Sequence, residues 1–223
     1  MRTPMSVLVE QFRIKTDKQL ALRFNIAPTQ MVAAVRAQGA DKSRELAVLK
    51  WGLVPGWATD PSIGSRLINA RSESVADKPS FRSAFKRRRC LVLADGYYEW
   101  KKIGKIKQPY LIHRRDDRPF AIAGLWEFWR PDANVEPLES CTIITTSASE
   151  SIQSVHDRMP VILNETDYDL WLDPANEDRS KLELLLVPYE GDELIGEQVT
   201  THVNNARNDD AKCLERLDAS TTK

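Results

Sequence analysis

The fold of this chain is constrained most by a series of short apolar runs that favour β-strands. Each run has three to six residues and is rich in β-branched, aromatic or other apolar side chains. The runs are Met31–Val35, Leu46–Lys50, Cys90–Leu93, Tyr110–His113, Phe120–Leu125, Cys141–Thr146 and Val161–Leu163. Because they do not alternate regularly with helical segments, a doubly wound parallel sheet is disfavoured. The pattern predicts an α+β fold with a closed or nearly closed sheet.

Glycine and proline positions refine this prediction. Gly104 separates Tyr97–Lys102 from Gln108–His113, an arrangement typical of a β-hairpin whose turn contains the glycine. Helical spacing or start signals are fewer. They occur in Asp17–Phe24, Ser80–Lys86, Ser149–Val155, Glu165–Leu172 and Asp209–Leu217. Pro174 is expected to end the fourth of these segments, because proline disfavours helical geometry in the residue before it.

Length and composition indicate an ordinary globular protein. The 223 residues can bury a sizeable core, and we expect a single domain over residues 1–223. No apolar run approaches the roughly 20 residues that cross a bilayer, and no secretory signal is evident. The three cysteines (Cys90, Cys141 and Cys213) are widely spaced and odd in number, which argues against a disulfide framework. We therefore expect a cytoplasmic protein without membrane contact.

The net charge of zero hides a marked asymmetry along the chain. Residues 1–130 carry 25 Lys and Arg against 12 Asp and Glu, whereas residues 131–223 carry 7 against 20. The basic part includes the run Lys86–Arg89 and the lysines at 101, 102, 105 and 107. A basic surface attracts phosphates by releasing their counterions, so the asymmetry is compatible with a nucleic-acid partner. Folding could equally intermingle the two signs of charge.

Glu99 is a candidate proton-transfer residue. It follows the apolar run that begins at Cys90 and stands among Tyr97, Tyr98 and Trp100. Aromatic surroundings remove water from a carboxylate, which raises its pKa and suits it to acid–base chemistry. Glutamate on a strand more often faces solvent, so this pattern alone leaves both interpretations open.

His156 is the second candidate, one of three histidines in the chain. It follows a predicted helix, and imidazole can exchange protons near neutral pH. A capping or core histidine would have the same sequence context, and His113 and His202 are interpreted as structural. No group of His, Cys and Asp shows the spacing of metal ligands, so we expect no metal site.

Asn69 can orient a reacting centre, because a side-chain amide both donates and accepts hydrogen bonds. Arg71 and Arg158 stand beside the amide and the imidazole in sequence, and guanidinium groups suit phosphate oxygens. Turn formation by the asparagine and surface ion pairing by the arginines are the alternatives. Trp57 is a candidate for stacking on unpaired bases, whereas Trp51 is expected in the core.

Four segments together resemble the SOS-response-associated peptidase family of abasic-site processing proteins. They are Asn69-Ala-Arg71, Gly96-Tyr-Tyr-Glu99-Trp100, His156-Asp-Arg158-Met-Pro160 and Trp51-Gly-Leu-Val-Pro-Gly-Trp57. The resemblance runs from about Phe24 to Arg207. It implies a mainly antiparallel, barrel-like β core with peripheral helices.

The resemblance also implies an activity in the DNA damage (SOS) response. Family members bind single-stranded DNA that has lost a base, also next to duplex junctions, and have associated lyase and autoproteolytic activities. By matching positions, Asn69, Glu99 and His156 would be catalytic, and Arg71 and Arg158 would hold the DNA backbone. No cofactor is implied. We expect a monomer that joins the nucleoid when it binds DNA.

The family's nucleophile has no counterpart among the printed residues. Family members begin with Met-Cys-Gly-Arg-Phe or a similar segment, and the cysteine exposed by methionine removal forms a thiazolidine with the abasic aldehyde. This ring needs an amine and a thiol on one residue, so an internal cysteine cannot form it. We expect that a cysteine-bearing segment belongs upstream of Arg2–Phe12, which would continue it into a polar stretch and a helix. A family member that has lost its nucleophile is the alternative.

Two rival functions remain from the sequence. A noncatalytic binder of single strands or junctions would use Arg71, Arg158, the run Lys86–Arg89 and exposed aromatic residues. A conventional cysteine peptidase would pair an internal thiol with His156, but Cys90 and Cys141 lie in apolar strands, where a buried thiol stays protonated.

Overall fold

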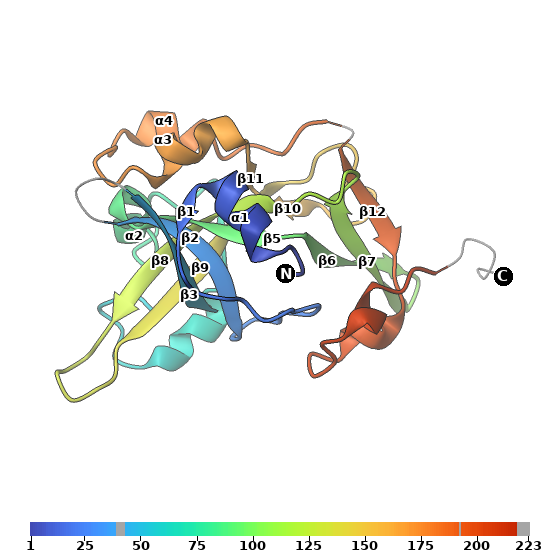
Figure 1. Ribbon diagram of the computed structural model, residues 1–223, viewed down its shortest axis with the longest axis horizontal. Helices are drawn as coiled ribbons and strands as arrows, with labels where there is room; N and C mark the ends of the chain where they lie inside the picture. Colours follow the sequence, from blue (N-terminus) through green and yellow to red (C-terminus); the bar gives the residue numbers. More distant parts are fainter. Residues whose placement is uncertain (39–42, 192, 218–223) are drawn as a thin grey trace.

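The computed structural model describes residues 1–38, 43–191 and 193–217, and it contains two sheets. Figure 1 shows the larger sheet beside the smaller one, with helices over one side of the larger sheet. The larger, nine-stranded sheet comprises β1 (Ile14–Lys15), β2 (Met31–Gln38), β3 (Ser43–Trp51), β4 (Asn69–Arg71), β5 (Arg89–Ala94), β8 (Phe120–Trp129), β9 (Leu138–Ser147), β10 (Arg158–Pro160) and β11 (Ile162–Leu163).

The larger sheet closes on itself. Strands β3, β2, β5, β8 and β9 pair in that order, and each of these pairings is antiparallel. β9 then returns to β3 through a short parallel pairing, in which Trp51 lies opposite Cys141. Closure removes free sheet edges and encloses a packed interior. The predicted α+β fold with a mainly antiparallel, barrel-like core is confirmed.

Strand β9 positions the two segments that contain Asn69 and Arg158. β4 runs parallel to it, with Asn69 opposite Ile143 and Arg71 opposite Thr145. β10 is antiparallel to β9, and β11 pairs with β8, so residues 158–163 are inserted where β8 and β9 diverge. The Asn69 and Arg158 segments therefore both pair with the same strand.

The smaller sheet has three strands in the order β12 (Leu194–Gln198), β7 (Ile106–Arg114) and β6 (Gly96–Ile103). β6 and β7 form the predicted hairpin, and its turn places Gly104 at a φ of 60°, a conformation that glycine adopts without strain. β6 is the edge strand of this sheet. In Figure 1 the N-terminus lies between the barrel and β6.

Helices cover one face of the barrel. They are α1 (Met5–Phe12), α2 (Arg82–Arg87), α3 (Tyr168–Leu172) and α4 (Arg179–Glu183). Apolar side chains from each of them, including Leu8, Phe85, Trp171 and Leu182, join one core cluster with alternate residues of the strands. Residues of the opposite strand face, such as Val92 and Ile122, form a second cluster. Such alternation is the expected consequence of the twofold side-chain period of a strand.

All seven predicted strand runs lie in or overlap strands, but three predicted helices are wrong. Residues 17–24 form no helix, and the backbone N–H groups where the segment ends, at Phe24 and Asn25, donate to the distant Asp209 carboxylate. Ser149–Val155 forms successive turns, and Asp209–Leu217 contains only the 3-10 helix η4 (Ala211–Leu214). Ser80–Lys86 overlaps α2, and Glu165–Leu172 corresponds to the 3-10 helix η2 (Glu165–Asp167) followed by α3.

The remaining elements are short 3-10 helices, η1 (Pro61–Arg66) and η3 (Thr201–Asn204). Within the described ranges, no helix is both long enough and apolar enough to span a membrane. The three cysteines are all buried as free thiols, in agreement with the expected lack of a disulfide framework.

Candidate active site between the two sheets

Five of the six residues singled out by sequence as catalytic or DNA-binding line a single cleft. The cleft has a volume of about 670 Å³ and lies between the barrel and the edge strand β6. The five residues are Asn69, Arg71, Glu99, His156 and Arg158. Apolar residues of the second core cluster, such as Val92, Ile122 and Met159, also line it. The cleft is therefore apolar in part, with polar groups brought in from separate segments.

Glu99 lies in the middle of β6 and is half-buried. Burial raises its pKa above the ordinary value of 4.5, and the nearby Asp157 carboxylate acts in the same direction. The imidazole of His156 and the backbone N–H of Trp100 oppose this effect without cancelling it. The expectation of a desolvated carboxyl group is confirmed. Glu99 thus holds its proton to a higher pH than an exposed glutamate does.

His156 lies in the loop between the successive turns and β10. Its Nδ1 atom is 3.1 Å from the backbone nitrogen of Arg158, which donates a hydrogen bond to it. Because backbone contacts hold Nδ1, Nε2 is the ring nitrogen that can exchange a proton with a bound molecule. The side chain is 39% exposed, so solvent or a ligand can reach it.

Asn69 and Arg71 project from β4 on the same side, because the buried Ala70 between them points to the opposite face. Both side chains are exposed. Upstream, Gly52 adopts a φ of 125° and its Cβ, if present, would lie 2.6 Å from the carbonyl oxygen of Gly64. This close approach requires glycine and draws the end of β3 against the segment that leads into β4.

Arg158 is held by the protein itself. Its guanidinium donates to both carboxylate oxygens of Glu73, at 2.5 and 3.1 Å, and to the carbonyl oxygen of Thr145 at 2.7 Å. The pair lowers the pKa of Glu73 to about 2. Arg71, in contrast, forms no salt bridge with any residue that the structure describes. Of the two arginines, Arg71 is therefore the one with an uncompensated charge in the cleft.

The two tryptophans differ in their relation to the cleft. Trp57 is 61% exposed and does not line the cleft. Trp51, which we expected in the core, packs against the second core cluster but also lines the cleft. Its Nε1 donates to the carbonyl oxygen of Ile68 at 2.8 Å, next to Asn69. Trp51, together with Trp100, is therefore positioned to contact a molecule in the cleft.

The N-terminus forms one wall of the cleft, and sequence reasoning missed the residue that anchors it there, Asp95. The Met1 amine donates to the carbonyl oxygen of Arg23 at 2.5 Å, and it lies 3.7 Å from a carboxylate oxygen of Asp95. Asp95 also accepts hydrogen bonds from the Arg2 backbone and from the Thr3 hydroxyl. Asp95 immediately precedes Gly96 and its neighbouring motif, a position that the sequence alone does not mark as an anchor.

Tyr97 is a further cleft residue without a predicted role. Its ring packs edge-on against Phe120, and it lies on the same face of β6 as Glu99. The hydroxyl oxygen is buried, with no hydrogen-bond partner among the described residues. A buried hydroxyl without a partner has a donor and lone pairs available for a ligand or an ordered water in the cleft.

The basic run Lys86–Arg89 is not a phosphate-binding surface as a unit. Arg89 is only 2% exposed and donates to backbone carbonyl groups. Arg88 pairs with Glu127, and Arg87 pairs with Glu177. Three of the four charges in this run are thus engaged within the fold, so the run contributes less to a DNA surface than the sequence suggested.

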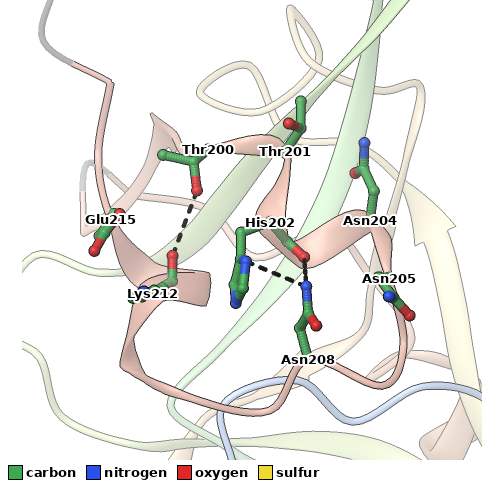
Figure 2. Close-up of a pocket in the computed structure, with 8 residues that line it drawn as sticks. All are labelled: Thr200, Thr201, His202, Asn204, Asn205, Asn208, Lys212 and Glu215. Carbon is green, nitrogen blue, oxygen red and sulfur yellow. Dashed lines mark hydrogen bonds between the residues drawn. The ribbon is translucent and has the colours of Figure 1, made fainter.

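A second, more open pocket of about 560 Å³ lies over η3 and η4 (Figure 2). Near it, His202, Asp210 and Cys213 bring potential ligand atoms within 4.8 Å of one another, a group that sequence spacing did not reveal. His202 Nε2 is 3.2 Å from the Asp210 carboxylate, and the Cys213 thiol contacts the carbonyl oxygen of Asn208 at 3.5 Å. Burial raises the pKa of Cys213, which disfavours the thiolate that a metal requires. We assign no metal to this group.

His113 is structural, as predicted. It is 4% exposed, and its Nε2 lies 2.9 Å from a carboxylate oxygen of Glu197. This contact connects β7 with β12 within the smaller sheet.

Comparison with known proteins gives a consistent result. The sequence matches the family described as SOS response associated peptidase (SRAP) over residues 1–206. The abasic site processing protein YoqW of Bacillus subtilis (strain 168) is 40% identical over 213 residues, which cover 93% of each chain. The abasic site processing protein HMCES of Gallus gallus is 36% identical over 210 residues, covering 83% of this chain and 62% of that protein.

The fold has a counterpart among crystal structures. A protein from Bacteroides thetaiotaomicron superposes with a TM-score of 0.85 at 24% identity, and the match covers 97% of both chains. At this level of identity the likeness establishes a shared fold.

Proposed function

The chain belongs to the SOS response associated peptidase family, and from this premise we propose that it processes abasic sites in single-stranded DNA. The cleft between the sheets would receive the nucleotide that lacks its base. The observation that carries the proposal is the convergence of Glu99, His156, Asn69 and Arg71 on that cleft from separate segments of the chain.

The electrostatics of the cleft support an acid–base role for two of these residues. Glu99 has a raised pKa, so it can act as a proton donor at a higher pH than an exposed carboxyl group. His156 offers Nε2 for proton exchange. The Asn69 amide would hold the reacting sugar in place, and Arg71 would bind a flanking phosphate.

The proposed reaction begins with the open-chain aldehyde form of the abasic sugar. A primary amine attacks the carbonyl carbon, and loss of one water gives an imine. Addition of a thiol from the same residue to the imine carbon closes a thiazolidine, so the net loss is one water. Glu99 would protonate the departing hydroxyl, and its carboxylate or His156 would accept a proton from the nucleophile. Elimination from the same imine would give the associated lyase activity.

The internal thiols are unsuited to this chemistry or to a conventional peptidase. Cys90 and Cys141 are fully buried, and burial raises the pKa of both, that of Cys141 to about 12. The Met1 amine, by contrast, lies in the wall of the cleft. A cysteine-bearing segment joined ahead of Arg2 would therefore lead into the chain at the cleft wall, and we propose that autoproteolytic exposure of its cysteine supplies the nucleophile.

The test uses single-stranded DNA with one abasic site, analysed by denaturing electrophoresis and intact mass. The printed chain is compared with a version that carries Met-Cys-Gly-Arg-Phe-Thr-Leu in place of Met1. We expect a covalent adduct with the cysteine-bearing version only. A Cys→Ala change in the added segment is the matched control and should abolish the adduct.

Other outcomes decide against the proposal. If neither version forms an adduct but both bind the DNA, the cleft serves noncatalytic binding. If neither version prefers abasic over intact DNA, the proposed substrate is wrong. Loss of activity after alkylation of Cys90 or Cys141 would instead point to a thiol peptidase.

The ion pair between Arg158 and Glu73 makes a separate prediction about DNA affinity. Glu73→Gln is expected to tighten DNA binding by roughly threefold to tenfold at low salt, because it frees Arg158 for phosphates and removes a negative charge. The same change should also remove a contribution to the free energy of unfolding that varies with pH. Since the folded pKa of Glu73 is lowered to about 2, the pair stabilises the fold above the unfolded pKa and is lost as pH falls toward 2.

Fluorescence anisotropy with labelled DNA measures the affinity, and urea unfolding between pH 2 and pH 7 measures the stability. Glu10→Gln, an equal change of charge at an exposed position on α1, is the control. Equal affinities for the two variants would show that Arg158 does not contact the DNA.

A further inference from the structure

The hairpin formed by β6 and β7 carries a group of cations that the site described above does not use. Lys101, Lys102, Lys105 and Lys107 surround its turn, and the last three side chains are exposed. None of the four forms a salt bridge or a side-chain hydrogen bond within the described ranges. The only acidic residue in the hairpin, from Gly96 to Arg114, is Glu99. Unlike the Lys86–Arg89 run, this group keeps its charge available.

The register of the hairpin places two of these charges face to face. Lys102 lies directly opposite Lys107 in the β6–β7 ladder. Like charges in this position repel each other and destabilise a strand pair. The arrangement is unfavourable for the isolated protein, and an anion bound between the two ammonium groups would relieve it.

Along strand β6, the lysines follow directly after the residues that line the cleft. Glu99 and Trp100 line the cleft from β6, and the next two residues of the strand are Lys101 and Lys102. At about 3.3 Å per residue, Lys102 and Ile103 lie roughly 10–13 Å beyond Glu99. That is the length of about three to four nucleotides in a helical strand. A strand held at Glu99 would therefore bring its phosphates past the hairpin.

We propose that this hairpin binds the phosphodiester backbone of the DNA strand where it leaves the cleft, three or more nucleotides from the abasic site. The inference rests on the proposed function and adds to it a second contact. This contact depends on how many nucleotides flank the abasic site and not on the lesion itself. The hairpin supplies point charges only, so it does not read sequence.

The test compares two triple variants that remove equal charge. Lys102, Lys105 and Lys107 are replaced by glutamine in the first. Lys15, Lys78 and Lys86, which are also exposed, are replaced in the second. Lys15 lies on β1 and Lys86 on α2, both on the opposite side of the molecule from β7 in Figure 1. Binding is measured by anisotropy on oligonucleotides that contain one tetrahydrofuran, a stable abasic analogue.

For an oligonucleotide with about ten nucleotides on each side of the analogue, the hairpin variant should bind about tenfold more weakly than the parent at about 50 mM salt. The slope of log K against log salt should fall in magnitude by about 2. The control variant should stay within about twofold of the parent. For an oligonucleotide with only two nucleotides on each side, the hairpin and control variants should bind equally.

In a further measurement, a complementary strand is annealed to one flank of the oligonucleotide. A loss of affinity confined to this substrate would assign the contact to duplex phosphates. Equal affinity of both triple variants for every substrate overturns the hairpin contact while leaving the abasic-site proposal intact. Failure of the parent to bind any substrate overturns both. The hairpin variant should unfold at the same temperature as the parent or higher; if it unfolds earlier, the single variant Lys102→Gln replaces it.

Discussion

Glu99→Gln in the cysteine-bearing version is expected to slow covalent capture of an abasic site by about 10²–10⁴-fold while leaving the fold at least as stable at neutral pH. Glutamine keeps the size of the side chain and its ability to accept hydrogen bonds, but it cannot transfer a proton. DNA binding should change little, because Arg71 and the hairpin lysines would still supply the charge. Single-turnover rates at saturating DNA separate this chemical defect from weak binding.

The stability part of this prediction follows from the direction of the pKa shift. Burial raises the pKa of Glu99 in the folded state above 4.5. As pH rises through the unfolded pKa, the unfolded chain releases its proton first and gains stability relative to the fold. The resulting loss of folding stability reaches its full size once pH exceeds the pKa of Glu99 in the folded state. Glu99→Gln should therefore raise the urea midpoint at pH 7, and the gain should vanish below about pH 4.

Glu10→Gln serves as the control, since Glu10 is exposed on α1 and does not line the cleft. It should alter neither rate nor midpoint. An unchanged rate for Glu99→Gln would exclude proton transfer by this residue and favour a cleft that only binds. A lower midpoint at pH 7 would mean that the folded state prefers the ionised carboxylate, contrary to the burial argument.

Arg89→Met is expected to lower the free energy of unfolding by about 3–5 kcal/mol, one of the largest effects of any single change in this chain. The Arg89 guanidinium is almost completely buried and donates five hydrogen bonds to main-chain carbonyl groups. Those carbonyl groups belong to Phe85, Lys86, Trp171, Asp173 and Asn176.

These acceptors lie near the C-terminal ends of α2 and α3, where carbonyl groups lack partners within the helix. Methionine would leave them buried without donors, which costs about 1–3 kcal/mol for each group that water cannot reach. Arg89→Lys keeps the charge but not the planar donor geometry, and should recover only part of the loss. The thermal midpoint should fall by about 10 °C for Arg89→Met in a chain of this size.

Arg87→Met is the matched control two residues away. Arg87 is 67% exposed and pairs with the exposed Glu177, so its loss should cost less than about 1 kcal/mol. Equal urea midpoints for the Arg89 and Arg87 variants would show that the buried guanidinium does not hold the helix ends. Reduced DNA affinity of Arg89→Met without loss of stability would restore the phosphate-binding interpretation of this run.

The comparison of prediction with structure separates local from long-range information. The runs at Met31, Cys90 and Phe120 predicted strands because short apolar runs of this kind are visible locally in the sequence. The hairpin around Gly104 was predicted because a glycine favours its turn. The segment that ends at Phe24 was wrongly expected to be helical; the Phe24 N–H is instead bound by the carboxylate of Asp209, 185 residues further along the chain, a contact that no local pattern shows.

The same division applies to the candidate site. Glu99, His156 and Asn69 could be chosen as candidates from the sequence because the motifs that contain them, which carry the family resemblance, are local. The sequence could not show which cations remain available to bind a ligand. An arginine such as Arg158, for example, is neutralised by Glu73, which lies 85 residues away in sequence. The sequence also could not show that Trp51, besides packing against the core, lines the cleft, whereas Trp57 does not.

By itself, then, the sequence determined the strand runs, the hairpin and the candidates for proton transfer, since these depend on side-chain chemistry and on short local patterns. Tertiary structure alone decided the closure of the barrel through β3 and β9, the meeting of the candidate residues in one cleft and the distribution of free charge. The physical reason is that burial and ion pairing arise between residues far apart in the chain, and they form only when the whole core closes around them.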